Sequence, residues 1–285
     1  MTFRAACLQL RSSTDVEENI ETVERLAREA AAAGAGYVQT PEMTNIVERR
    51  RSSLAAKIEP EESDPAVTRF AALAAELGIV LHIGSLALKA PEGKIANRAL
   101  VFGRDGQVLA RYDKIHLFDV DLPGGESWRE SAVYHPGTQA VVLDLPWIRL
   151  GVSICYDLRF PQLYRAQAHA GAAGLTAPSC FTKQTGEAHW HVLQRARAIE
   201  NGAFMISAAQ GGRHADGRET FGHSMIVAPW GEVLAEAGGD GPEVIVAEID
   251  PALSAEVRQR IPSLANERSF ALPATEQPAR MRSTS

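Results

Sequence analysis

Cys155 has the sequence context of a nucleophile. It ends the apolar run 150–155, and residues 156–161 directly after it are typical of the opening of a helix. At such a strand-to-helix turn the side chain is exposed at the edge of a sheet, and backbone N–H groups and the helix dipole favour a thiolate. Position alone also fits a core cysteine at the end of a strand, so the assignment depends on partner residues.

Nucleophilic cysteine chemistry needs a base and a positive group that holds the developing oxyanion. Glu42 follows Pro41 at the end of a short apolar strand, where burial would raise the pKa of its carboxyl toward that of a general base. Lys114 lies where a strand passes into a long loop, and its ammonium could favour the thiolate and then the oxyanion. Taken alone, each could also be an ordinary capping or solvent-exposed side chain.

The elements that must position these residues indicate an α/β protein. Strands are predicted at 3–10, 37–40, 79–88, 97–102, 108–112, 148–155, 174–177, 203–209, 221–228 and 243–249, and helices at about 15–33, 64–77, 161–170 and 187–200. A βαβ unit opens each half, and an Asp-Gly pair between the fourth and fifth strands marks a hairpin. We therefore expect two packed sheets covered by helices, with ligands at the carboxyl ends of the parallel strands.

The 285 residues show no linker or break in composition between the two halves. Residues 1–271 are therefore predicted to form one domain. The polar stretch 272–285 is expected to be a flexible tail or an arm between subunits. Residues 113–137 form a long excursion rich in charge, Gly and Pro, and loops of that length inside compact domains are usually functional.

Charge and composition exclude several classes of partner. The 29 basic and 35 acidic residues give a net charge of -6, which offers no electrostatic footprint for nucleic acid or an anionic membrane. No apolar run is long enough to cross a bilayer, and the N-terminus lacks the features of a signal peptide, so a cytoplasmic protein is expected. The cysteines Cys7, Cys155 and Cys180 lie far apart and predict neither a disulfide framework nor a structural zinc site.

Three segments resemble the motif blocks of the nitrilase superfamily of carbon-nitrogen hydrolases. They are Pro-Glu-Met at 41–43, Tyr-Asp-Lys-Ile-His-Leu-Phe-Asp at 112–119 and Ile-Cys-Tyr-Asp-Leu-Arg-Phe-Pro at 154–161, in the order that the family uses. The similarity runs from Phe3 to about Phe270. It implies a four-layer αββα sandwich, a homo-oligomer of at least two subunits, and no metal or organic cofactor.

The resemblance also implies a role for each residue. Cys155 corresponds to the nucleophile, Glu42 to the general base and Lys114 to the residue that stabilises the tetrahedral intermediate. Glu130 matches the second glutamate, which supports the lysine and the substrate, and Glu126 is the weaker candidate for that role. The chemistry implied is attack on an amide carbonyl, release of the amine, and hydrolysis of a thioester.

Four further residues are expected around the substrate. The backbone N–H of Tyr156 would share the oxyanion with Lys114, since the amide after a nucleophile points at the developing charge. Arg159 could bind a substrate carboxylate with both arms of its guanidinium, or form a salt bridge that holds the turn. Phe181 and Thr182 are expected to line the pocket.

The residues after the cysteine indicate the Nit-type amidases, since true nitrilases typically have Trp-Glu there. Residues 210–214 (Gln-Gly-Gly-Arg-His) resemble amidases of deaminated glutathione most, which favours its hydrolysis to 2-oxoglutarate and cysteinylglycine. The alternative is an omega-amidase acting on 2-oxoglutaramate or 2-oxosuccinamate. An N-carbamoyl amino acid hydrolase and a non-catalytic interaction module are less favoured. His191 and Cys180 depart from the family pattern, which usually has Glu and a small residue at these positions.

A cluster of Glu187, His189 and His191 suggests a metal site, but the expected helix geometry opposes it. Residues two apart on a helix point about 200° apart, so the two histidines cannot share a ligand face. The spacing also matches no zinc motif. No metal site is therefore expected.

Overall fold

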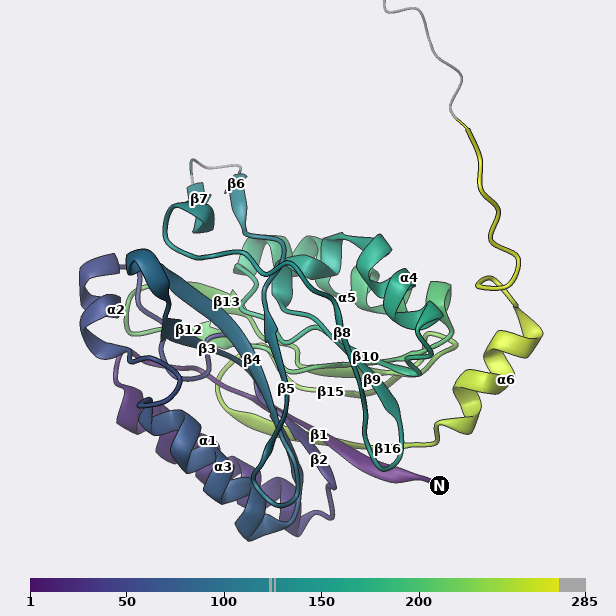
Figure 1. Ribbon diagram of the computed structural model, residues 1–285, viewed down its shortest axis with the longest axis horizontal. Helices are drawn as coiled ribbons and strands as arrows, with labels where there is room; N and C mark the ends of the chain where they lie inside the picture. The colour runs from purple at the N-terminus through teal and green to yellow at the C-terminus, as the bar shows by residue number, and fades with distance from the viewer. Residues whose placement is uncertain (123–124, 126, 272–285) are drawn as a thin grey trace, which may run out of the picture.

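The computed structural model describes residues 1–122, 125 and 127–271 (Figure 1). Glu126 and the predicted tail 272–285 lie outside the described residues. In the described part of the chain, none of the helices is both long and apolar enough to span a membrane.

The first half of the chain builds one sheet with two helices on its outer face. The sheet has the order β16-β1-β2-β3-β4-β5. Its strands are β1 (Phe3–Gln9), β2 (Tyr37–Gln39), β3 (Val80–Lys89), β4 (Ile95–Phe102), β5 (Val108–Asp113) and β16 (Glu243–Ile249), and its helices are α1 (Val16–Ala32) and α3 (Pro65–Leu77). Strands β1, β2 and β3 pair in parallel, and β3, β4 and β5 form an antiparallel meander. The predicted βαβ opening and hairpin are thus confirmed.

The second half repeats this plan. Its sheet has the order β15-β14-β11-β10-β9-β8. The strands are β8 (Val141–Asp144), β9 (Arg149–Val152), β10 (Gly174–Thr176), β11 (Phe204–Ser207), β14 (Met225–Val227) and β15 (Val233–Glu236), and the helices are α4 (Pro161–His169) and α5 (Lys183–Asn201). Between β9 and α4 lies the short 3-10 helix η3 (Cys155–Arg159). Figure 1 shows α1 and α3 on one side and α4 and α5 on the other, with the sheets between them, so the αββα sandwich is confirmed.

Strand β1 shows why two sheets and two helix layers arise from one pattern. Its side chains alternate, as the period of a strand requires. Ala5 and Cys7 pack into the core between the sheets, whereas Ala6 and Leu8 pack beneath α1 and α3. Because both faces are covered, the strand is apolar almost without interruption, as buried parallel strands are.

Helix boundaries follow local capping, which explains one wrong prediction. Asp64 accepts hydrogen bonds from the N–H groups that open α3, and Gly78 ends that helix in the left-handed region at φ 61°, both as expected. Helix α5, predicted from residue 187, begins at Lys183. The side chain of Thr182 accepts from the N–H of Thr185 and caps the helix four residues earlier.

Several small elements were absent from the sequence prediction. They are α2 (Arg51–Lys57), η1 (Pro91–Gly93), β6 (Asp119–Asp121), β7 (Ser127–Arg129), η2 (Glu130–Ala132), β12 (Gly211–Arg213), β13 (Glu219–Phe221) and α6 (Ala252–Arg260). The strand predicted at 221–228 is broken into β13 and β14 by residues 222–224, where His223 has φ 56°. The hairpins β6–β7 and β12–β13 carry residues of the pocket described next.

Candidate active site

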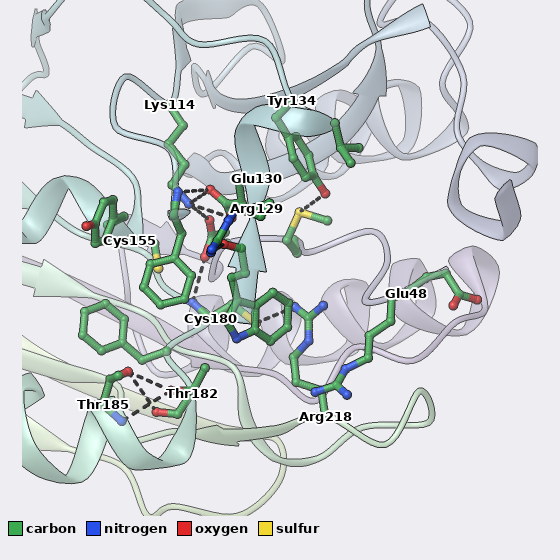
Figure 2. A pocket seen from close by; sticks show the side chains of 18 of the residues that line it. Glu48, Lys114, Arg129, Glu130, Tyr134, Cys155, Cys180, Thr182, Thr185 and Arg218 are labelled. Atoms are coloured by element: carbon green, nitrogen blue, oxygen red, sulfur yellow. Dashed lines mark hydrogen bonds and ion pairs between the residues drawn. The ribbon is translucent and has the colours of Figure 1, made fainter. Parts of the chain in front are cut away.

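A cavity of about 470 Å³ opens at the carboxyl ends of the parallel strands (Figure 2). All eight residues that the sequence indicated line it: Glu42, Lys114, Glu130, Cys155, Tyr156, Arg159, Phe181 and Thr182. Its volume lies within the range of about 300 to 1,000 Å³ usual for small-molecule sites. The structure therefore brings together side chains that come from both sheets and from the excursion at 113–137.

Glu42 is placed by a tight crossing of backbones at the end of β2. The N–H of Met43 donates to Oγ of Ser85 at 2.9 Å, and Met43 itself has φ 58°. Gly84 lies beneath this turn, where a Cβ would meet the carbonyl oxygen of Thr40 at 2.1 Å and that of Pro41 at 2.6 Å. Only glycine therefore lets β3 approach the strand end that carries Glu42.

Cys155 stands on a strained turn held by Asp157. Its φ is 49°, in the left-handed region, and its N–H donates to the carbonyl of Pro178 at 2.9 Å. The Asp157 carboxylate accepts from the N–H of Ile154 at 2.8 Å and from the hydroxyl of Tyr112 at 2.6 Å. Because Tyr112 belongs to β5, this carboxylate ties the turn of the nucleophile to the strand that leads into Lys114.

The buried ammonium of Lys114 lies between two glutamates. Its Nζ is 2.8 Å from Oε1 of Glu42 and 2.8 Å from Oε2 of Glu130, and the lysine side chain is 1% exposed. Oε2 of Glu130 also accepts from the N–H of Phe118 at 2.8 Å. Figure 2 shows Lys114 and Glu130 pointing toward each other, with Cys155 beside them.

Glu42 is held as a carboxylate. Burial alone would raise its pKa, but the charge of Lys114 and hydrogen bonds from Cys155, Lys114 and Asn97 outweigh burial and lower the pKa below its usual range. Nδ2 of Asn97 donates at 2.9 Å, and the N–H of Cys180 donates to the other oxygen at 3.0 Å. The expectation that burial raises the pKa of Glu42 is therefore wrong, because these donors and the ammonium favour the charged form.

The thiol of Cys155 is correspondingly neutral. Burial raises its pKa, the negative charge of Glu42 and a hydrogen bond to Glu42 raise it further, and Lys114 only partly offsets these effects. The expected resting thiolate is thus not what the site favours. A thiol beside a carboxylate can instead lose its proton to Glu42 as it attacks, which is general-base activation of a nucleophile.

The remaining charges divide between lysine and the second glutamate. Burial raises the pKa of Glu130, although the ammonium of Lys114 opposes this shift. The pKa of Lys114 lies well above its usual value, because Glu130 and Glu42 together overcome the effect of burial. The ammonium is consequently permanent at neutral pH, and of the two carboxyls Glu42 is the more readily ionised.

A match of residues 4–259 to the model of the carbon-nitrogen hydrolase family decides which family this site belongs to. The chain belongs to the carbon-nitrogen hydrolase family. Among its relatives are the omega-amidase NIT2 of Homo sapiens, 38% identical over 94% of this chain and 96% of that protein, and the deaminated glutathione amidase of Synechocystis sp., 39% identical over 92% of this chain and 97% of that protein.

Solved structures agree with this placement in the nitrilase superfamily. The NitFhit protein of C. elegans superimposes with a TM-score of 0.87 at 34% identity, and the match covers 94% of this chain and 65% of that protein. Nit3 of Saccharomyces cerevisiae gives a TM-score of 0.82 at 30% identity, covering 92% of this chain and 94% of that one.

The pocket of this carbon-nitrogen hydrolase contains residues that sequence reasoning missed. Arg218 and Trp128 face each other, with the guanidinium carbon 4.5 Å from the ring centroid. Asn97 lies in the middle of β4, and Arg218 lies in the hairpin between β12 and β13. No local motif marks these positions; the charge of Arg218 beside a pocket-lining segment was the one available signal.

Arg159 contacts aromatic walls of the pocket. Its guanidinium carbon is 5.2 Å from the Phe181 ring centroid and 6.0 Å from that of Tyr156, and its Nη1 lies 3.2 Å from Nδ1 of His189. No carboxylate within residues 1–122, 125 and 127–271 forms an ion pair with Arg159. The salt bridge considered as its alternative role is absent from this part of the chain.

The histidines of α5 point to different partners, as helix geometry predicted. His189 meets Arg159, whereas Nε2 of His191 lies 2.7 Å from Oε1 of Glu236. Nδ1 of His223 lies 2.8 Å from the same oxygen, so these three side chains are the described group able to hold a cation, and they lie outside the pocket. In the structure, Glu236 links the two rings by hydrogen bonds, and those bonds lower its pKa although burial opposes this.

Proposed function

We propose that this protein is a cysteine-dependent amidase that uses Glu42, Lys114 and Cys155. The observation that carries the proposal is one buried cluster in which Glu42 bonds to Lys114 at 2.8 Å and to the Cys155 thiol, at the base of a small-molecule cavity. Two amidase relatives that align along nearly the whole chain support it.

The reaction follows from these contacts. Glu42 takes the thiol proton as the sulfur of Cys155 attacks the amide carbonyl, and the oxyanion forms beside the Lys114 ammonium and the N–H of Tyr156. Collapse breaks the C–N bond, and Glu42 returns the proton to the departing amine. A water then gives a proton to Glu42 and attacks the thioester, which releases the acid and restores the Cys155 thiol. Glu130 keeps the ammonium in place.

The substrate is proposed to be an anion, because the pocket is locally cationic in an acidic protein. Among the described residues its lining carries six basic side chains (Arg49, Arg51, Lys114, Arg129, Arg159 and Arg218) and three acidic ones (Glu42, Glu48 and Glu130). The whole chain has a net charge of -6, so the positive potential belongs to the pocket. Walls of low dielectric strengthen such a local field.

Within this class, we place deaminated glutathione first and 2-oxoglutaramate second. Residues 210–214 resemble amidases of deaminated glutathione, and a relative of that name is 39% identical. The human relative named as an omega-amidase is 38% identical, which keeps that activity as the alternative. We also propose a cytoplasmic location, where Cys7, Cys155 and Cys180 would stay reduced, as the structure has them.

Turnover of both amides by the purified protein, followed by mass spectrometry of the products, tests the proposal. The protein should release 2-oxoglutarate, and intact mass should reveal an acyl group on Cys155 early in the reaction. Cys155→Ala should lose at least about a thousandfold in kcat/KM, because no other group forms the thioester. Full activity of that variant would exclude Cys155 as the nucleophile, and a large preference for 2-oxoglutaramate would reverse the order of substrates.

Chemistry on a neighbouring family member is consistent with a reactive cysteine. In a structure of an amidase from Nesterenkonia sp. AN1, at 27% identity and a TM-score of 0.76, acrylamide has added to the active-site cysteine. We expect the same reagent to label Cys155, which offers a count of active sites before each assay.

A further inference from the structure

We propose that Arg218, stacked on Trp128, binds a carboxylate on the amine side of the scissile bond, so that the pocket accepts amides with a carboxylate at each end. The inference rests on the proposed amidase function and specifies its substrate class. It assigns a second anion subsite, separate from the one that Arg159 offers.

Arg218 is a buried cation on the wall of the pocket. Its side chain is 14% exposed, and its guanidinium lies over the indole of Trp128 and 3.8 Å from Sγ of Cys180. Figure 2 shows Arg218 on the side of the pocket away from Cys155 and Lys114. An arginine keeps its charge in such a place, because its pKa is too high for it to be neutralised.

The guanidinium of Arg218 lacks the partner that a buried cation needs. Its Nε has no hydrogen-bond acceptor among the described residues, and Oδ2 of Asp216 lies 3.9 Å from Nη2, beyond hydrogen-bond reach. Burying such a group without an acceptor costs free energy, and an incoming carboxylate could recover it through two parallel N–H···O bonds. The arrangement is therefore suited to an anionic ligand.

The geometry around Glu42 places this subsite on the amine side. The departing nitrogen receives its proton from Glu42 and must face that carboxylate. Oε2 of Glu42 accepts from the N–H of Cys180, and the sulfur of Cys180 touches the guanidinium of Arg218. A group attached to the departing nitrogen is thus directed past Cys180 toward Arg218.

Arg159 contacts another wall. Its guanidinium packs on Phe181 and Tyr156, next to the proposed oxyanion site, whereas Arg218 packs on Trp128. An acyl group with a carboxylate would meet Arg159, and a departing amine with a carboxylate would meet Arg218. Deaminated glutathione has both carboxylates, and 2-oxoglutaramate has only the one on the acyl side.

The test compares Arg218→Gln with wild type on three substrates: deaminated glutathione, the same molecule with its glycine carboxylate converted to an amide, and 2-oxoglutaramate. The ratio of kcat/KM for deaminated glutathione to that for 2-oxoglutaramate should fall about ten- to hundredfold, mostly through KM. For wild type, the amidated analogue should show a similar loss, and Arg218→Gln should add little to it. Arg213→Gln removes an exposed positive charge from the same hairpin and is the matched control.

Two results would overturn the subsite: an unchanged ratio in Arg218→Gln, or equal kcat/KM of wild type on deaminated glutathione and its amidated analogue. The second measurement needs no variant, so it decides even if Arg218→Gln does not fold. Arg218→Lys should recover part of the ratio, since it restores the charge without the planar fork. If wild type cleaves 2-oxoglutaramate through a Cys155 thioester but the ratio ignores Arg218, this inference alone fails; if it cleaves neither amide, the proposed function fails.

Discussion

At the scale of single residues, the site works through one shared ammonium. Lys114 contacts Glu42 and Glu130 at 2.8 Å each, and burial makes each charge depend on the others. Glu42 is ionised because Lys114 and its donors compensate for its lost hydration. Cys155 stays protonated because the ionised Glu42 opposes a second negative charge. Acid and base are thus set apart by a few close contacts, as in other sites with paired titratable groups.

Opposite shifts are expected in the pKa of Cys155 when its two charged neighbours are removed. Glu42→Gln should lower it by about one unit or more, because a charge that opposes ionisation is lost while Lys114 stays. Lys114→Met should raise it further. Since the thiolate is the form that reacts, alkylation of Cys155 by iodoacetamide should reach its plateau at lower pH in the first variant and at higher pH in the second.

Peptide mass spectrometry keeps the label on Cys155 apart from that on Cys180 and Cys7. Burial and the other causes raise the pKa of Cys180 to about 11, so its labelling should rise only in alkaline solution and can serve as an internal reference. If both variants shifted in the same direction, the charges of Glu42 and Lys114 would not control the thiol.

At the scale of elements, the site depends on how closely strand ends approach one another. Strand β3 passes beneath the turn after β2, and a Cβ on Gly84 would also meet Cβ of Pro178 at 2.4 Å. Pro178 accepts from the N–H of Cys155 and follows β10 in the second sheet. Gly84 therefore lies where the strand end that carries Glu42 meets the segment that holds the nucleophile.

Gly84→Ala should destabilise the protein by about 2 to 4 kcal/mol, because backbone atoms rather than flexible side chains would have to move. In the fraction that folds, kcat should fall about a hundredfold, since small displacements of catalytic groups are costly. Urea unfolding and kinetics on the same preparation measure both effects.

Gly238→Ala is the matched control, because its added Cβ would meet only Oε2 of Glu243, at 3.7 Å, and its φ is not positive. It should change stability by less than about 0.5 kcal/mol. Equal stability and activity of the two variants would show that the approach of β3 to β2 is not needed.

At the scale of the whole molecule, both sheets contribute to one site. Glu42 follows β2 and Lys114 follows β5 in the first sheet, whereas Cys155 follows β9 in the second. This division supports the proposal that residues 1–271 act as a single domain, because neither half alone would hold the three catalytic groups.

We also propose that the protein forms at least a dimer, as the family resemblance implies, and that α5 takes part. Val192 and Ile199 lie seven residues apart on one face of α5 and are 68% and 48% exposed. The turn with Trp230, itself 50% exposed, lies against this helix, since Arg195 donates to the carbonyl of Gly231 at 2.8 Å. Apolar side chains grouped in this way are typical of an interface.

Val192→Asp should weaken the dimer at least about tenfold in Kd, because a charge would be placed in an apolar contact. Sedimentation equilibrium over a range of concentrations measures this. Leu109→Asp, at a leucine that is 49% exposed on β5 in the other sheet, is the control and should leave the dissociation constant unchanged. Sedimentation of the wild type as a pure monomer would contradict the proposed assembly.

The sequence by itself determined the elements and the candidate chemistry of this protein. Strand and helix periods, the caps at Asp64 and Gly78, and the three motif blocks were enough to predict an αββα sandwich and eight residues that line one pocket. These features are local: each depends on the order of residues within one segment.

Only the tertiary structure decided the charge states, the start of α5 and the subsite at Arg218. Glu42 is an ionised base because Asn97 from β4 and the N–H of Cys180 donate to it, and neither is near it in the chain. Arg218 faces the pocket because its hairpin packs against Trp128 from the excursion. The energy of a charge depends on which groups surround it in space, and segments distant in the sequence supply those groups.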